Sequence, residues 1–175
     1  MNAPDPSSFA PLLRENKAIL HKVAFAYCHD ADDRRDLVQE MAIQLWRSFP
    51  RFDGRVKFST WAYRVSMNVA VSWLRSEHRR PRDTVPIEDL EREIEATDQV
   101  FDEASDNMRV LRGLIDGLDG LNRALILLYL DGHSGEEIGE ILGITTANVT
   151  TRVNRVKREL QAGFARLEQP LEKTA

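Results

Sequence analysis

Apolar residues recur every three or four positions along most of the chain, which is the period of an α-helix with one buried face. In the first half, this pattern predicts helices over residues 9–27, 33–49 and 58–78, with Asp32 or Asp33 as the candidate N-cap of the second. No stretch alternates between apolar and polar residues as a half-buried strand does. We therefore expect an all-α fold.

The second half of the chain predicts further helices that end in a helix-turn-helix over residues 132–160. A strongly apolar helix over residues 118–130 can support this motif. Ser134 and Glu137 have the spacing of a capping box, and Gly143 can adopt the left-handed conformation that ends a helix. The second helix of the motif then carries one apolar stripe. Its members are Val149, Val153, Val156 and Leu160.

The opposite face of that second helix is polar and basic, which suits the major groove of duplex DNA. Gly139 agrees with a tight helix-turn-helix, because glycine lets another helix pass close by, at a cost of about 1 kcal/mol in helix propensity. The alternative is an ordinary corner of two helices with a solvated basic face. The candidate DNA-contacting residues are Thr146, Ala147, Asn148, Thr151, Arg152, Arg155 and Arg158.

The helix predicted over residues 58–78 is apolar nearly all round, but it carries one polar and basic strip. This strip is either a solvated face or a contact with a nucleic-acid strand, in which Arg binds phosphate and Asn bonds a base edge. Residues 51–57, just before the helix, add three basic side chains and an Asp-Gly turn. The candidate strand-contacting residues are Arg51, Arg55, Lys57, Trp61, Arg64, Asn68, Ser72, Arg75 and Arg79.

Several aromatic residues lie in or near that helix. Such side chains can stack an unpaired base, although taken singly they are more often part of a core. They are Phe52, Phe58, Trp61, Tyr63 and Trp73.

The net charge of −4 conceals an uneven distribution along the chain. Residues 1–80 carry +4 and residues 81–131 carry −8, whereas residues 132–175 are neutral, with most of their basic side chains on the second helix of the motif. Within the acidic segment, residues 82–106 have few apolar positions, so we expect a linker there. Two outer segments with basic faces thus flank a segment that nucleic acid would repel.

The composition argues against several classes of protein. No apolar run approaches the roughly 18 residues of a membrane span, and the N-terminus lacks the features of a signal peptide. We therefore expect a cytoplasmic protein without membrane insertion. Cys28 is the single cysteine, and the four histidines have no metal-ligand spacing, so we expect no disulfide, metal or cofactor. No nucleophile–base pair or phosphate-binding glycine loop is visible, so we do not expect an enzyme.

Three stretches resemble a known family, in the order in which the family has them. The family is the extracytoplasmic-function (ECF, group IV) sigma factors, the promoter-specificity subunits of bacterial RNA polymerase. Its region 2.2 is similar to residues 33–49, DRRDLVQEMAIQLWRSF. Its regions 2.3 and 2.4 are similar to residues 54–80, GRVKFSTWAYRVSMNVAVSWLRSEHRR. Its region 4 is similar to residues 118–160, LDGLNRALILLYLDGHSGEEIGEILGITTANVTTRVNRVKREL.

This resemblance implies two small helical domains. Sigma region 2, residues 9–81, would bind core polymerase and open the −10 element, with residues 51–57 receiving a flipped base, whose extraction costs a few kcal/mol. An acidic linker over residues 82–106 would lead to sigma region 4, residues 107–168, which would read the −35 element as duplex. The nine strand-contacting candidates would serve the −10 element, and the seven candidates on the helix-turn-helix would serve the −35 element.

The resemblance also implies protein partners. Core polymerase would be bound through its β′ clamp and β flap, and many relatives are held silent by an anti-sigma factor. The side of the second helix that would dock on the β′ clamp lies outside its apolar stripe. Its residues are Asp36, Gln39 and Glu40.

The chain departs from the family pattern at a few positions. Thr150 and Thr151 stand where many relatives have Lys and Ser, so the basic residue after Val149 is missing. Gly139 stands where alanine is common, and Ser72 where an aspartate is frequent. These differences bear on the preferred promoter sequence rather than on the class of protein.

We therefore expect a sigma factor that directs promoter-specific transcription initiation. The alternative is a helix-turn-helix transcriptional regulator, which would bind duplex DNA without core polymerase and would lack the single-strand contacts of Asn68. A helical adaptor that uses the helix-turn-helix face to bind protein is a further alternative, against which the charge distribution argues.

Overall fold

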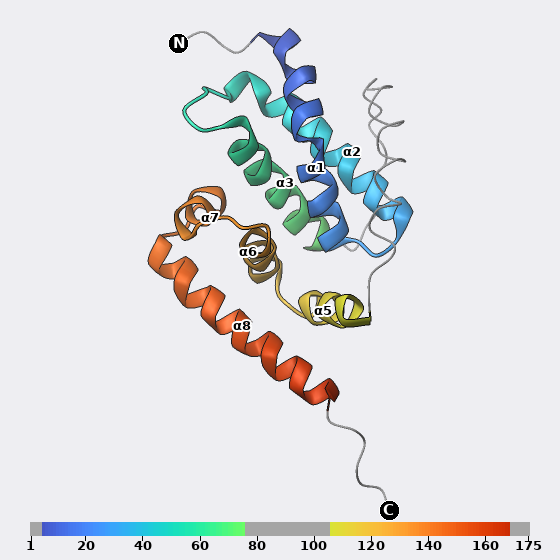
Figure 1. The fold of residues 1–175 in the computed structure, drawn as a ribbon. Helices are drawn as coiled ribbons and strands as arrows, with labels where there is room; N and C mark the ends of the chain where they lie inside the picture. Colours follow the sequence, from blue (N-terminus) through green and yellow to red (C-terminus); the bar gives the residue numbers. More distant parts are fainter. Residues whose placement is uncertain (1–4, 76–105, 169–175) are drawn as a thin grey trace, which may run out of the picture. The chain divides into compact units, whose positions relative to one another are not determined.

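The computed structural model describes residues 5–75 and 106–168, and every regular element within these ranges is helical (Figure 1). The chain divides into two compact units, Met1–Asp102 and Glu103–Ala175. The expected all-α fold is confirmed. Apart from Asp106, the linker predicted over residues 82–106 lies outside the described residues, and so does Arg79.

The described part of the first unit contains three long helices: α1 (Phe9–Tyr27), α2 (Ala31–Ser48) and α3 (Phe58–Arg75). Short 3-10 turns, Pro6–Ser8 and Phe49–Arg51, precede α1 and follow α2. Each long helix packs against the other two, as Figure 1 shows, so their apolar faces share one core. The largest fully buried side chains of this core are Leu20, Val23, Leu37, Val38, Met41, Leu45 and Met67.

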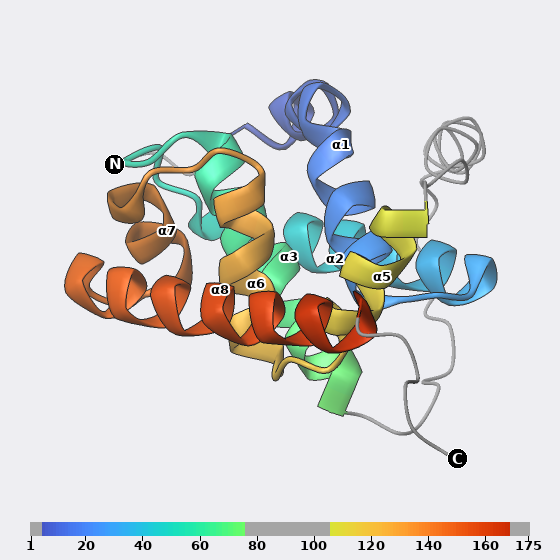
Figure 2. The ribbon, with the colours of Figure 1, turned by 60° about the horizontal axis from the view of Figure 1, so that its bottom comes forward.

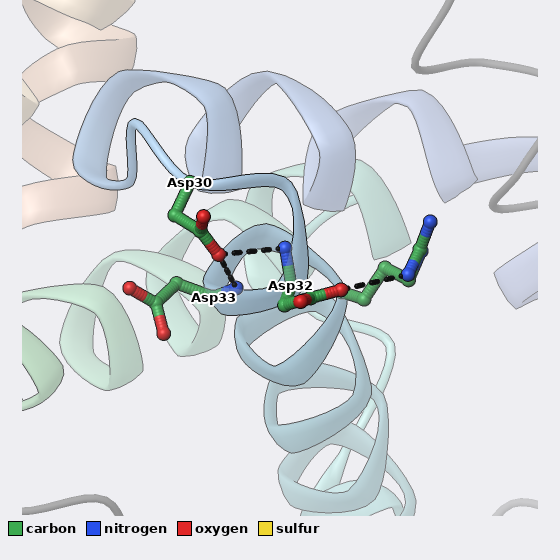
Figure 3. Close-up of polar contacts among 4 residues, drawn as sticks. Asp30, Asp32 and Asp33 are labelled. Atoms are coloured by element: carbon green, nitrogen blue, oxygen red, sulfur yellow. Dashed lines mark hydrogen bonds and ion pairs between the residues drawn. The ribbon is translucent and has the colours of Figure 1, made fainter.

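Asp30, rather than Asp32 or Asp33, caps α2, so that prediction was wrong. Oδ1 of Asp30 accepts hydrogen bonds from the main-chain amides of Asp32 at 2.9 Å and Asp33 at 3.1 Å (Figure 3). Asp32 instead pairs with Arg35 on the surface, at 2.9 Å. Using the first aspartate as the cap leaves the other two in the first helical turn, where the helix dipole favours negative charge.

Replacing this cap should weaken the first unit. We expect Asp30→Ala to lower its free energy of unfolding by about 1 kcal/mol, because two main-chain amides lose their acceptor. Urea denaturation followed by tryptophan fluorescence measures this change, since Trp46, Trp61 and Trp73 are the only tryptophans and all lie in the first unit. Asp32→Ala is the matched control and should cost less than about 0.5 kcal/mol. Equal losses in the two variants would argue against the cap.

Within residues 106–168, the second unit contains four helices: α5 (Asp106–Asp116), α6 (Gly120–Leu130), α7 (Gly135–Leu142) and α8 (Thr146–Glu168). The first three all pack against α8, which Figure 2 displays along its whole length. The predicted stripe on α8 is buried as expected: Val149, Val153, Val156 and Leu160. Among the described residues, no helix combines the length and hydropathy needed to cross a bilayer.

Helix α6 begins two residues later than its apolar pattern suggested. Asp119 is its N-cap, and Oδ1 of Asp119 accepts a hydrogen bond from the main-chain amide of Asn122 at 2.9 Å. Leu118 therefore lies before the helix, but it is still buried in the core. The apolar side chain of Leu118 therefore contributes to core packing without being part of the helix.

Helix α5 docks on α8 through a notch at Gly163. A Cβ atom at this position would lie 2.5 Å from Cδ2 of Leu114, so the leucine occupies the space that a side chain there would need. Leu114 joins a cluster that ties α5 and α6 to the second half of α8. Its buried members are Leu118, Ile126, Val156 and Leu160, and Leu111, Leu114 and Ile115 pack against them.

Candidate nucleic-acid interface

The turn between α7 and α8 has the geometry expected of a helix-turn-helix. The hydroxyl of Ser134 accepts a hydrogen bond from the Glu137 amide at 3.2 Å, and the Glu137 carboxylate accepts one from the Ser134 amide at 2.8 Å. This reciprocal pair is the predicted capping box. Gly143 ends α7 in the left-handed conformation, with φ 70° and ψ 33°. The local sequence therefore fixes both ends of α7.

Gly139 allows the turn to pass directly over α7. A Cβ atom at residue 139 would lie 2.7 Å from the main-chain oxygen of Ile144, a distance that real Cβ atoms essentially never adopt. The Ile144 amide also donates to the Gly139 oxygen at 3.0 Å, which holds the two backbones together. The predicted need for a small residue at this corner is confirmed.

The structure brings the seven candidate residues of the helix-turn-helix together on the first turns of α8. Six of them are exposed: Thr146, Ala147, Asn148, Thr151, Arg155 and Arg158. Arg152, the seventh, is half-buried. The first turns of α8 therefore offer a polar and basic face to a ligand.

Arg152 is held by two amide side chains. Nε of Arg152 donates to Oδ1 of Asn148 at 3.1 Å, and Nη1 of Arg152 lies 3.5 Å from Oδ1 of Asn122 on α6. Asn122 is buried, and its Nδ2 donates to Oδ2 of Asp119 at 2.6 Å. The sequence did not predict a role for Asn122, because nothing in the helical pattern indicates a contact between residues thirty positions apart.

The threonine hydroxyls on α8 bond within the helix. The hydroxyl of Thr151 donates to the Ala147 carbonyl at 3.0 Å, and that of Thr150 donates to the Thr146 carbonyl at 3.1 Å. Such bonds to the preceding turn are typical of threonine inside a helix. They leave the methyl groups of these exposed side chains as the parts without an intrahelical partner.

The strip predicted on the third helix lies on α3 of the first unit. Asn68, Ser72 and Arg75 are exposed, whereas Arg64 is half-buried. Within the described residues, Asn68 makes no hydrogen bond, so its amide can meet a ligand. An exposed polar and basic strip on a helix that otherwise packs into the core agrees with both interpretations of this strip given above.

Phe52, Phe58 and Trp61 form one aromatic cluster rather than separate stacking platforms. Trp61 lies with its ring centroid 5.1 Å from that of Phe52 and 5.3 Å from that of Phe58. Phe58 and Tyr63 are only 7% and 4% exposed, so they are core residues and cannot stack a base. Phe52 and Trp61 are half-buried and remain accessible at the edge of this cluster.

The loop before α3 presents its basic side chains to solvent. Arg51, Arg55 and Lys57 are all exposed, and Gly54 makes the turn with φ 71°. Nε of Arg55 lies 3.1 Å from the carboxylate of Asp53, and Oδ1 of Asp53 also accepts from the Arg55 amide at 3.1 Å. The loop is therefore held partly by its own side chains.

The candidate polymerase-binding residues lie on one long side of α2. Asp36, Gln39 and Glu40 are half-buried, whereas Leu37 and Met41 on the apolar side are completely buried. The predicted division of α2 into an apolar and a polar side is thus present.

Comparison with known proteins identifies both units. The family model of Sigma-70 region 2 matches residues 12–80, and that of Sigma-70 region 4 matches residues 108–160. The chain is 31% identical over 153 residues to the ECF RNA polymerase sigma-E factor of Escherichia coli, covering 80% of this chain and 79% of that protein. The chain belongs to the ECF sigma factors. The resemblance stated from the sequence is confirmed.

Another relative is similar to this chain in sequence, and two solved structures are similar to it in fold. The RNA polymerase sigma-H factor of Pseudomonas aeruginosa is 30% identical over 155 residues, covering 83% of this sigma factor and 78% of that protein. CnrH, solved with the cytosolic domain of CnrY, shares the fold with a TM-score of 0.65 and 20% identity, over 94% of this chain and 92% of that one. RpoE from Bartonella quintana, solved with the anti-sigma factor NepR, also gives 0.65 and 20%, over 93% and 99%.

Membership of this family confirms the expected general function. A sigma factor directs core RNA polymerase to specific promoters, so this protein acts in promoter-specific transcription initiation. The regulator that binds duplex DNA independently of polymerase is not favoured. Sigma factors are not in general enzymes.

Proposed function

We propose that this sigma factor divides promoter recognition between its two units. Residues 9–81 bind core polymerase and the −10 element, residues 107–168 read the −35 element, and residues 82–106 connect them. The observation that carries the proposal is the exposed polar and basic face of α8, which follows a capped and tightly turned α7. Helix-turn-helix proteins place the N-terminal residues of such a helix in the major groove.

In the second unit, the seven residues on α8 divide by chemistry. Arg155 and Arg158 supply charge for phosphate or guanine contacts, and Arg152 is oriented by Asn148 and Asn122. An arginine whose guanidinium is already oriented loses less side-chain entropy when it binds. We therefore assign Arg152 to a fixed phosphate contact.

In the first unit, we assign single-strand contacts to α3 and the loop before it. Asn68 bonds a base edge of the opened −10 element, while Arg64, Ser72, Arg75 and Arg79 follow the phosphates. The loop receives a base, which is surrounded by Arg51, Arg55 and Lys57. Trp61 lies at the edge of the site for this base. The exposure of Asn68 and of the basic loop residues supports this assignment.

The protein partners follow from the same division. Asp36, Gln39 and Glu40 dock on the β′ clamp, and the second unit meets the β flap. An anti-sigma factor holds the protein silent, a proposal supported by the partners in the CnrH and RpoE structures. The protein works in the cytoplasm with polymerase and catalyses no reaction of its own.

Run-off transcription with purified core polymerase over a promoter library tests the proposal. The expected result is a set of start sites that core polymerase alone does not use, whereas the free protein binds the same duplexes poorly. We expect poor binding because, without core polymerase, nothing holds the two DNA-binding units of the protein at the spacing of the −10 and −35 elements. Tight specific binding by the free protein, or no new start sites, would contradict the proposal.

Arg155→Ala should weaken promoter recognition without affecting the association with core polymerase. Within the described residues Arg155 has no hydrogen-bond partner, so its guanidinium is available to DNA. We expect a loss of about 1–3 kcal/mol in promoter affinity of the holoenzyme, measured with labelled duplex. Arg166→Ala, near the other end of α8, is the matched control and should bind normally. A defect in core binding would mean that the face is misassigned.

Asn68→Ala should impair strand opening more than it impairs assembly with core polymerase. Loss of one base contact should reduce open-complex formation about tenfold, the equivalent of about 1.4 kcal/mol, as reported by permanganate reactivity of unpaired thymines. On a template with the −10 region already unpaired by mismatches, the defect should shrink, because opening is no longer required. Equal defects in opening and in core association would contradict the assigned role.

A further inference from the structure

The face of α8 that meets the −35 duplex has an apolar centre. We propose that Thr151, with Ala147 beside it, reads the 5-methyl group of a thymine in the −35 element. The proposal rests on the proposed function, because it names the base that the same face recognises.

Thr151 and Ala147 lie one turn apart, at the middle of the exposed face. Successive residues of an α-helix point about 100° apart, so both side chains point roughly 160° away from Val149, which is buried. Both are exposed and lie in the first two turns of α8. In helix-turn-helix proteins, this part of the second helix approaches the base edges most closely.

The hydroxyl of Thr151 is already engaged inside the helix. It donates to the Ala147 carbonyl at 3.0 Å, so the methyl group is the part of Thr151 that a base meets. Ala147 offers only its own methyl group. Thr150, on the flank of the face, repeats the arrangement: its hydroxyl donates to the Thr146 carbonyl at 3.1 Å. The centre of the face therefore presents methyl groups rather than donors.

Asn148, the polar neighbour of Thr151 and Ala147 on this face, is poorly placed to read an adenine. A bidentate contact with adenine needs both the oxygen and the nitrogen of an asparagine amide. Oδ1 of Asn148 accepts a hydrogen bond from Arg152 at 3.1 Å, so an adenine contact would have to displace the arginine. Thymine is the standard base that carries a methyl group in the major groove, and Ala and Thr methyl groups are its usual apolar contacts.

The test uses holoenzyme and a promoter selected from the library. Each thymine of its −35 element is replaced in turn by deoxyuridine, which keeps the pairing edge and lacks only the methyl group. At one position we expect affinity to fall about fourfold, the equivalent of one buried methyl group. Deoxyuridine in flanking duplex is the control and should have no effect. A selected −35 element without thymine, or with thymines that can all be replaced without loss, would overturn the inference.

Two variants of similar size assign the effect to Thr151. Thr151→Val keeps a methyl group and loses the hydroxyl, so it should preserve the fourfold preference for thymine over deoxyuridine. Thr151→Ser keeps the hydroxyl and loses the methyl group, so the preference should fall close to one. A full preference in the serine variant, or its loss in the valine variant, would overturn the assignment.

The two levels of the proposal fail in different ways. A wild-type holoenzyme that produces no new start sites contradicts the proposed function, and the inference with it. New start sites together with an absent methyl effect contradict the inference alone.

Discussion

Gly139→Val should destabilise the second unit by roughly 3 kcal/mol while leaving the first unit unchanged. The added Cβ would stand 2.7 Å from the main-chain oxygen of Ile144, so backbone rather than a flexible side chain would have to move. Such a movement also strains the hydrogen bond from the Ile144 amide to the Gly139 oxygen, which is 3.0 Å long. The second unit would therefore lose stability, and the turn that orients α8 would be distorted.

Two observables separate this effect from a general loss of folding. Amide hydrogen exchange should show reduced protection across α7 and α8, whereas the tryptophan-fluorescence transition, which reports on the first unit, should stay in place. Gly113→Val is the matched control, because nothing lies within 4 Å of a Cβ atom there. Valine exceeds glycine in helix propensity by a few tenths of a kcal/mol, so this control should not destabilise α5. Similar losses at both positions would refute the steric explanation.

Asp116→Asn should also destabilise the second unit, by about 2 kcal/mol. Arg123 is only 4% exposed; its Nη1 lies 3.5 Å from Oδ1 of Asp116, and its Nη2 donates to the Asp116 main-chain oxygen. Removing the carboxylate charge leaves a buried cation without that counter-charge. We expect less than the roughly 3–5 kcal/mol of a fully buried pair, because the Asp116 side chain is 23% exposed.

The surface pair of Asp32 and Arg35 provides the control for this prediction. Their side chains are 76% and 48% exposed, so Asp32→Asn should change stability by less than about 0.5 kcal/mol. For Asp116→Asn, the change in stability is measured by amide hydrogen exchange of α5 and α6 as the temperature is raised. For Asp32→Asn, it is measured by tryptophan fluorescence during unfolding. If Asp116→Asn were as mild as Asp32→Asn, the buried pair would contribute nothing beyond its packing.

The sequence was most informative where one local rule decides the structure. The period of apolar residues predicted α1 correctly from Phe9 to Tyr27, and the capping box and Gly143 predicted both ends of α7. It was less informative where several residues satisfied the same rule. Three aspartates precede or begin α2, and only the backbone conformation of Asp30 selects it as the cap.

The remaining features depend on contacts between distant residues. The approach of Arg152 to Asn122 joins residues on different helices, and no spacing rule encodes it. Likewise, an aromatic residue beside a polar strip can face either the core or a ligand. Phe58 and Tyr63 are buried in the core, whereas Trp61 is half-buried.

The notch at Gly163 has one further consequence, for the alignment of α5 along α8. Leu114 fills the space left by the missing side chain of Gly163, so a shift of α5 along α8 would move the leucine toward residues that carry side chains. Such interlocking permits one register and excludes the adjacent ones. The last turn of α5, and with it the start of the connection to α6, is consequently held at one place along α8.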